Sequence, residues 1–268
     1  MNIAFQNENV TLWHGDCREW SGKADAVISD PPYGMNLNTD FSGMTGWSGK
    51  GHKYEPIAGD DAPFDPAPWL ATGKAQVFWG AQYFCHRLPE VGGWLVFNKR
   101  GDGKPSKICF GDCELAWCSV GQAVRMFSRM WHGVARWSSE GRLHPTQKPV
   151  DLMAWCMEKA KVPDGATVLD PYAGSGTTLI AALETGRKVI GVEIDARWVD
   201  VAKRRLERWF SQPSLPFASE ARSTAASYHE TSFLPLGDTD HTEQRGCLES
   251  GSQPVAVSLA WETYKAND

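Results

Sequence analysis

A buried strand, a turn and a helix follow one another twice in the second half of the chain, and this alternation limits the fold more than any other feature. Thr167–Asp170 (TVLD) predicts a strand, and Gly174–Gly186 (GSGTTLIAALETG) predicts a turn and a helix that a glycine closes. Lys188–Ile194 (KVIGVEI) predicts the next strand, and Asp195–Phe210 predicts an amphipathic helix. Strands and helices that alternate at this spacing indicate an α/β fold with a parallel sheet.

The same alternation runs through the first 160 residues. Apolar runs predict strands at Val10–His14, Ala24–Ser29, Ala75–Trp79 and Val91–Asn98, and helices are expected at Ala67–Gly73 and Val150–Lys161. The pattern weakens between Lys99 and Leu143, where short strands and loops are expected. Aromatic residues in that segment fill a small core more often than they stack on bases. They are Trp117, Phe127, Trp131 and Trp137.

Composition limits the class of protein. The 268 residues are 42% hydrophobic, which is enough for one substantial core. No apolar run approaches the length of a membrane span, and the first ten residues lack the layout of a signal peptide. Seven scattered cysteines do not form a disulfide framework. We therefore expect a soluble, cytoplasmic protein that does not bind membranes.

The net charge of −5 is distributed unevenly. Residues 97–148 carry nine basic and four acidic side chains, whereas the segments on either side are acidic. A basic segment in an acidic protein is what a local phosphate-binding surface would produce, although an ordinary solvated face gives the same count. Charge alone leaves both interpretations open.

The glycine turn VLDPYAGSGTT carries the first indication of a ligand. It joins a strand to a helix, and Glu193 ends the following strand, so an acid is available for the hydroxyl groups of a ribose. A Walker-type phosphate loop needs a lysine after the last glycine, where Thr177 stands, and a nicotinamide fingerprint needs a glycine where Leu179 stands. An adenosyl ligand without pyrophosphate, S-adenosylmethionine, fits better, and a plain strand-to-helix turn is the alternative.

The stretch ISDPPYGM, Ile28–Met35, ends a second buried strand with an acid, two prolines and an aromatic ring. Asp-Pro-Pro forms turns well, which explains the prolines but not the acid and the ring together. Asn36–Asp61 follows, rich in Gly, Ser, Asn and Thr, and predicts a long mobile loop.

Three motifs together resemble one enzyme family. DPPYG at Asp30, HPTQKP at His144 and DPYAGSGTT at Asp170 are similar to motifs of the amino-group DNA methyltransferases, which make N6-methyladenine or N4-methylcytosine. Their order resembles that of the permuted beta group, and the match covers about residues 8–210. The resemblance implies a Rossmann-like, S-adenosylmethionine-dependent methyltransferase sheet with circularly permuted motif order and a small inserted target-recognition region.

The resemblance also implies a division of the chain into four parts. Residues 1–98 would form the catalytic half of the methyltransferase domain, including the DPPY turn and the mobile loop 36–61. Residues 99–143 would recognise the target sequence, and residues 144–210 would form the cofactor-binding half. Residues 211–268, dominated by Ser, Thr, Pro and Glu, are expected to be a flexible tail.

The catalytic role falls on the DPPY turn. The lone pair of an exocyclic amino nitrogen is delocalised into the ring, so hydrogen bonds from that group to a carboxylate and a carbonyl would favour its reactive form. Asp30 would supply the carboxylate, Pro31 the carbonyl, Pro32 a stiff frame, and Tyr33 a ring that stacks on a flipped base.

The resemblance assigns the cofactor, S-adenosylmethionine, to a larger set of residues. Asp16 would meet its adenine, Glu193 its ribose, and the glycine turn its methionine end, with the HPTQKP stretch packed beside the pocket. The expected cofactor-binding residues are Asp16, His144, Pro145, Thr146, Lys148, Asp170, Pro171, Tyr172, Gly174, Ser175, Gly176, Thr177 and Glu193.

The substrate implied by the resemblance is double-stranded DNA with a flipped target base. DPPY favours adenine, whereas SPPY favours N4-cytosine. The alternatives are N4-cytosine methylation, N-methylation of RNA or protein, and a non-catalytic DNA-binding relative. A bacterial or phage restriction-modification system would add a cognate endonuclease as partner, and a homodimer is open. Cys109, Cys113, Cys118 and His132 match no common zinc spacing, so no metal is expected.

Overall fold

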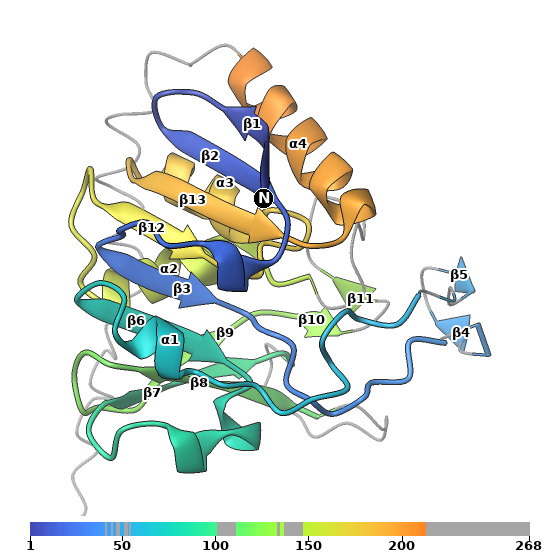
Figure 1. The fold of residues 1–268 in the computed structure, drawn as a ribbon. Helices are drawn as coiled ribbons and strands as arrows, with labels where there is room; N and C mark the ends of the chain where they lie inside the picture. Colours follow the sequence, from blue (N-terminus) through green and yellow to red (C-terminus); the bar gives the residue numbers. More distant parts are fainter. Residues whose placement is uncertain are drawn as a thin grey trace, which may run out of the picture. The chain divides into compact units, whose positions relative to one another are not determined.

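A nine-stranded mixed sheet forms the centre of the computed structural model (Figure 1). The structure describes residues 1–40, 42–43, 45–46, 49–50, 53, 55–100, 111–132, 135–136 and 147–212. The order of the strands across the sheet is β1-β2-β13-β12-β3-β6-β8-β7-β9. Their bounds are β1 Asn2–Gln6, β2 Val10–His14, β3 Ala26–Ser29, β6 Ala75–Trp79, β7 Gly93–Asn98, β8 Cys113–Cys118, β9 Arg125–Ser128, β12 Thr167–Asp170 and β13 Lys188–Glu193.

The five strands β2, β13, β12, β3 and β6 pair in parallel, as the sequence predicts. The sheet is not parallel throughout, however. Strand β1 pairs antiparallel with β2, and β8 pairs antiparallel with both β6 and β7. Strand β1 carries only two larger apolar side chains and lies at an edge, so its pattern is too weak to predict a strand.

The α-helices are α1 Ala67–Leu70, α2 Val150–Lys159, α3 Thr177–Glu184 and α4 Ala196–Ser211. Short 3-10 helices lie at Cys17–Glu19, Ala81–Tyr83 and Cys85–Arg87. Two small hairpins pair β4 (Thr45–Gly46) with β5 (Gly49–Lys50), and β10 (Trp131–His132) with β11 (Ala135–Arg136). The first hairpin lies within the stretch 36–61 that was expected to be a loop.

Alternate residues of the buried strands enter two cores, one on each face of the sheet. Ile28 and Trp79 pack in the core that also contains the buried faces of α2, α3 and α4. Val27 and Phe78 pack on the other face with Phe64 and other aromatic residues. Both faces of these strands are therefore covered, which explains their uniformly apolar sequence.

Segment 99–143 contributes two strands to this sheet. Strand β8 lies between β6 and β7, and β9 lies beside β7. Trp117 and Trp131 are buried, as expected of core aromatics, whereas Trp137 lies outside the described residues. The assignment of this segment to target recognition stays a prediction.

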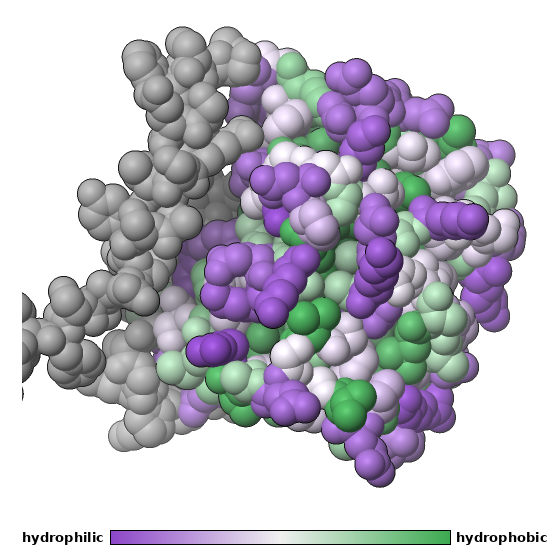
Figure 2. All heavy atoms as spheres, turned by 90° about the vertical axis from the view of Figure 1, so that its left-hand side faces the viewer, coloured by the Kyte–Doolittle hydropathy of each residue, from purple (hydrophilic) through white to green (hydrophobic). Residues whose placement is uncertain are grey.

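No described helix is long and apolar enough to cross a membrane. On the face shown in Figure 2, hydrophilic and hydrophobic side chains are interspersed. The parallel strands bring their carboxyl ends to one edge of the sheet, where Asp30 follows β3, Asp170 ends β12 and Glu193 ends β13. This is the edge at which α/β sheets bind ligands.

Candidate active site

The DPPY turn follows β3 directly, and the residues after it are hydrogen-bonded to Asp60 of the predicted loop. Asp60 is 4% exposed, and its carboxylate accepts hydrogen bonds from the backbone N–H groups of Gly34 at 2.9 Å and Leu37 at 2.8 Å. Its carbonyl accepts another from the N–H of Asn36. The two ends of the stretch 36–61 are therefore tied together beside the turn. The sequence analysis did not single out Asp60.

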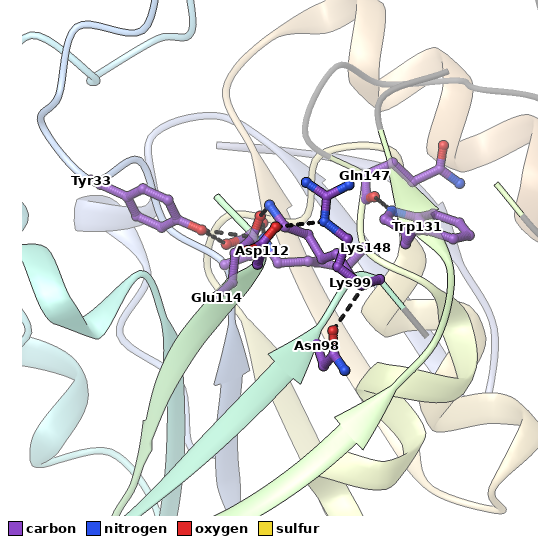
Figure 3. A network of polar contacts seen from close by, with 10 residues as sticks. Tyr33, Asn98, Lys99, Asp112, Glu114, Trp131, Gln147 and Lys148 are labelled. Atoms are coloured by element: carbon purple, nitrogen blue, oxygen red, sulfur yellow. Dashed lines mark hydrogen bonds and ion pairs between the residues drawn. The ribbon is translucent and has the colours of Figure 1, made fainter. Parts of the chain in front are cut away.

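Asp30 lies at the end of a chain of largely buried charged groups, of which Figure 3 labels Lys148, Glu114 and Lys99. Its Oδ1 accepts a hydrogen bond from the Tyr33 hydroxyl at 2.5 Å, and its Oδ2 accepts one from Lys148 Nζ at 2.7 Å. Lys148 Nζ also lies 3.0 Å from Glu114 Oε2, and the other oxygen of Glu114 lies 2.9 Å from Lys99 Nζ. Two acids and two lysines thus alternate through the site.

Burial and charge act against each other in this network. Burial raises the pKa of Asp30 and outweighs the opposing effect of Lys148. Burial also acts to raise the pKa of Glu114, but Lys148 and Lys99 together hold it at about 2. Burial acts to lower the pKa of Lys148, and the carboxylates of Asp30 and Glu114 nevertheless raise it well above its usual value. Lys148 is therefore a permanent cation.

The ring of Tyr33 fits between two neighbours. It stacks on Tyr83 with centroids 5.3 Å apart and an interplanar angle of 17°. On the Gly80 side, an added Cβ atom would lie 2.0 Å from the ring, so only glycine leaves room for it. Gly80 also has φ +71°, which favours glycine. Half of Tyr83 is exposed, so the stacked pair opens toward solvent.

The glycine turn between β12 and α3 is braced by a buried arginine. Gly176 is the N-cap residue before α3 and has φ +81°, and its N–H donates to the carbonyl of Ala173. Arg205 of α4 is 6% exposed, and its Nη1 donates to the carbonyl of Ser175 at 2.8 Å and to Thr177 Oγ1 at 3.2 Å. Arg205 therefore fixes the turn from the helix that follows β13.

Two buried carboxylates flank this turn. Asp170 Oδ1 accepts hydrogen bonds from Ser29 Oγ at 2.6 Å and from the Tyr172 N–H at 3.1 Å. Burial raises the pKa of Asp170 to about 6. Glu193 accepts one hydrogen bond on each oxygen, from the N–H of Gly174 at 2.7 Å and of Asp195 at 2.8 Å. Burial raises the pKa of Glu193 as well.

Asp16 has a more local role in the structure. It caps the 3-10 turn Cys17–Glu19 by accepting the N–H of Arg18, and it pairs with the Arg18 side chain. These hydrogen bonds lower the pKa of Asp16.

Three adjoining pockets at this edge contain most of the predicted site residues. The first is lined by the turn Asp30–Tyr33 together with Tyr172, Gly174 and Glu193. The second is lined by Asp16, Pro32, Pro171, Tyr172 and Glu193, and the third by Asp30, Lys148, Asp170, Tyr172, Gly174, Ser175 and Thr177. His144, Pro145 and Thr146 lie outside the described residues.

Four residues of the site were missed by the sequence analysis. Glu114, Asp60, Arg205 and Tyr83 carry no motif of their own. Only Arg205 left a signal, as a charged residue on the otherwise apolar face of the predicted helix. Lys148 was expected beside the cofactor pocket; it lines the third pocket with residues of the glycine turn, and its Nζ also lies against Asp30 and Glu114.

Comparisons with known proteins indicate the class of protein to which the chain is similar. Residues 98–204 match a family model described as DNA methylase. YubD of Escherichia coli (strain K12), provisionally named a methylase, is 29% identical over 207 residues, which are 72% of this chain and 88% of YubD. The DNA adenine methyltransferase YhdJ of the same strain is 45% identical over 64 residues, 24% of this chain and 21% of YhdJ. This chain therefore covers most of YubD but only about a fifth of YhdJ.

Among solved structures, the cytosine-N4-specific PvuII DNA methyltransferase is 12% identical with a TM-score of 0.50, over 83% of this chain and 93% of that one. The fold is that of the S-adenosylmethionine-dependent methyltransferases. Within that class the chain is similar to the amino-group DNA methyltransferases, through the family-model match of residues 98–204 and the similarity to YubD.

Proposed function

We propose that the protein transfers a methyl group from S-adenosylmethionine to N6 of adenine at specific sites in double-stranded DNA. One observation carries the proposal: the Asp30 carboxylate and the turn that holds it share a pocket with Gly174 and Glu193 of the cofactor motif. A base held by the turn would thus lie beside the cofactor.

The lining fits S-adenosylmethionine chemically. Asp170 is a buried acid beside the glycine turn, and its carboxylate would pair with the cofactor's amino cation. A carboxylate has about four acceptor positions, and the two backbone hydrogen bonds to Glu193 leave positions for the ribose hydroxyls. Tyr172 and Ile194 offer apolar surface for the adenine. The cofactor supplies an electrophilic methyl group when it is bound.

The DPPY turn performs the chemistry on the base. Asp30 and the carbonyl of Pro31 accept hydrogen bonds from the target amino group, which favours a lone pair available for attack on the methyl carbon. Transfer would form a carbon–nitrogen bond as the cofactor's carbon–sulfur bond breaks, with the neutral thioether as leaving group, and the proton lost from the methylated nitrogen would pass to solvent. Since the turn is held by its prolines and by Asp60, the nitrogen is positioned before the reaction.

Adenine is proposed as the base because the turn begins with Asp, as in the family members that act on adenine. The local identity of 45% with a DNA adenine methyltransferase supports this choice. N4-cytosine is the second candidate, because the same hydrogen bonds would suit its amino group. Cytoplasmic location, a cognate restriction endonuclease and a homodimer stay predictions.

Transfer of tritiated methyl groups tests the proposal. Unmethylated plasmid DNA, total RNA and a protein mixture would compete for wild-type protein and for the Asp30→Asn variant, with S-adenosylmethionine binding measured on both. We expect label in DNA with the wild type only, and equal cofactor binding. Label in RNA or protein, or cofactor binding without transfer to any acceptor, would contradict the proposal.

A further inference from the structure

Lys148 belongs to the HPTQKP stretch, which the family resemblance assigns to the cofactor side of the site. Lys148 lines the pocket of the glycine turn, but its ammonium group donates a hydrogen bond to Asp30 of the DPPY turn. Its side chain is 7% exposed, and its Nζ lies within 3.2 Å of Asp30, Tyr33 and Glu114. A buried ammonium so placed either balances charge for folding alone or acts on the reacting carboxylate.

The two oxygens of Asp30 are held differently. Oδ2 bonds to Lys148, whose own position is fixed by Glu114 on β8, which in turn is held by Lys99. Oδ1 bonds to the hydroxyl of Tyr33, the residue whose ring faces Tyr83 and the more exposed side of the turn. The DPPY turn also lines the first pocket, together with Gly174 and Glu193. Only the Tyr33 partner can leave without breaking a buried ion pair.

Resting on the proposed function, we propose that Lys148 is a positioning residue for methyl transfer. Its ammonium group holds Oδ2 of Asp30, so that Oδ1 faces the target amino group. The amino group then replaces the Tyr33 hydroxyl as the hydrogen-bond donor to Oδ1. Glu114, anchored by Lys99, holds Lys148 in register. The stretch HPTQKP thus contributes to the base side of the site through its lysine.

A cation and an anion near Asp30 affect its pKa with opposite signs, which gives the proposal a signed test. The charged or titratable groups facing Asp30 are Tyr33 of its own turn, Lys148 before α2, Cys156 on α2, Glu114 on β8 and Asp170 on β12. Lys148 lowers the pKa of Asp30, and Glu114 raises it. Removing one or the other charge should therefore move the titration of Asp30 in opposite directions, which general loss of structure would not do.

The experiment compares Lys148→Met, Glu114→Gln and the double variant with wild-type protein. Lys203→Met, on the surface of α4 with a side chain 45% exposed, is the matched control. Single-turnover methyl transfer to DNA is followed against pH at saturating S-adenosylmethionine. The titration of Asp30 is followed separately by carbon NMR of protein labelled at the Asp carboxyl carbon, with the peak assigned by Asp30→Asn.

We expect the acid limb of the rate profile to move up by about one pH unit in Lys148→Met and down in Glu114→Gln. The plateau rate should fall about tenfold or more in Lys148→Met, with S-adenosylmethionine affinity within about twofold of wild type. The NMR midpoints should shift with the same signs, and Lys203→Met should match wild type. If Lys148→Met does not fold, Glu114→Gln and the charge-balanced double variant carry the test.

A weakened S-adenosylmethionine affinity in Lys148→Met with an unmoved acid limb would return Lys148 to the cofactor and overturn the inference. So would shifts of the same sign in both single variants. Should wild-type protein transfer no methyl group to DNA, the proposed function fails, but the NMR titrations still decide whether Lys148 holds the Asp30 carboxylate.

Discussion

Asp170 should make the protein less stable at neutral pH in the absence of cofactor. Its pKa is about 6 in the folded protein against 3.8 for an unburied aspartate. Because the folded state binds this proton more tightly than the unfolded state, stability falls as pH rises from about 3.8 to 6 and stays low above that. The difference corresponds to about 3 kcal/mol at pH 8 and about 1.6 kcal/mol at pH 5.

Replacing Asp170 by Asn removes this penalty while keeping the shape of the side chain. The amide oxygen can accept from Ser29 and the Tyr172 N–H, since both bonds go to Oδ1. We therefore expect Asp170→Asn to stabilise the protein relative to wild type by about 1.4 kcal/mol more at pH 8 than at pH 5. This difference between two pH values does not depend on constant effects of the substitution.

Urea unfolding without cofactor at pH 5 and pH 8 measures the free energy of unfolding of Asp170→Asn relative to wild type. Asp164→Asn is the control, because the Asp164 side chain is 92% exposed. The same Asp170→Asn variant should bind S-adenosylmethionine at least tenfold more weakly, since it lacks the charge that meets the amino cation. An Asp170→Asn variant whose stability relative to wild type is the same at pH 5 and pH 8 would refute the reasoning.

Three other substitutions have defined outcomes. Gly80→Ala should destabilise the protein by about 1–3 kcal/mol and slow methyl transfer, because the added Cβ would lie 2.0 Å from the Tyr33 ring. Thermal unfolding and single-turnover rates measure the two effects, and an unchanged rate would contradict the prediction. Arg205→Met should loosen the glycine turn at Ser175 and lower the free energy of unfolding by about 1–3 kcal/mol, measured by urea unfolding. It should also weaken S-adenosylmethionine binding, measured by calorimetry, and unaltered binding would exclude a bracing role for Arg205. Glu193→Gln should weaken cofactor binding about tenfold but spare the rate at saturating cofactor, so a lost plateau rate with normal affinity would argue against it.

The parallel half of the sheet could be predicted from sequence because its strands are buried on both faces and bounded by turn residues. Strand β12, for example, has two fully buried apolar residues, Val168 and Leu169, and the glycine turn follows it. Strand β8 could not be placed, because its partners β6 and β7 lie antiparallel to it and its register depends on contacts far along the chain. Local pattern carries little information about such pairing.

The same difference separates the two halves of the site. Asp30 and Gly174 lie on the two turns of the site, and each stands in a local sequence motif whose spacing the proposed chemistry requires. Glu114 and Arg205 act through side chains that arrive from other elements of the sheet and its covering helices. Their partners are fixed only by the fold, and the buried charge of Glu114 looks in the sequence like any other charged residue.

The central claim is tested most directly by the modified nucleoside itself. Unmethylated plasmid DNA would be incubated with the protein and S-adenosylmethionine carrying a deuterated methyl group, digested to nucleosides and measured by mass spectrometry. We expect deuterated N6-methyladenine with the wild-type protein and none with Asp30→Asn. Deuterated N4-methylcytosine would contradict the assigned base, and the absence of any deuterated nucleoside would contradict the activity.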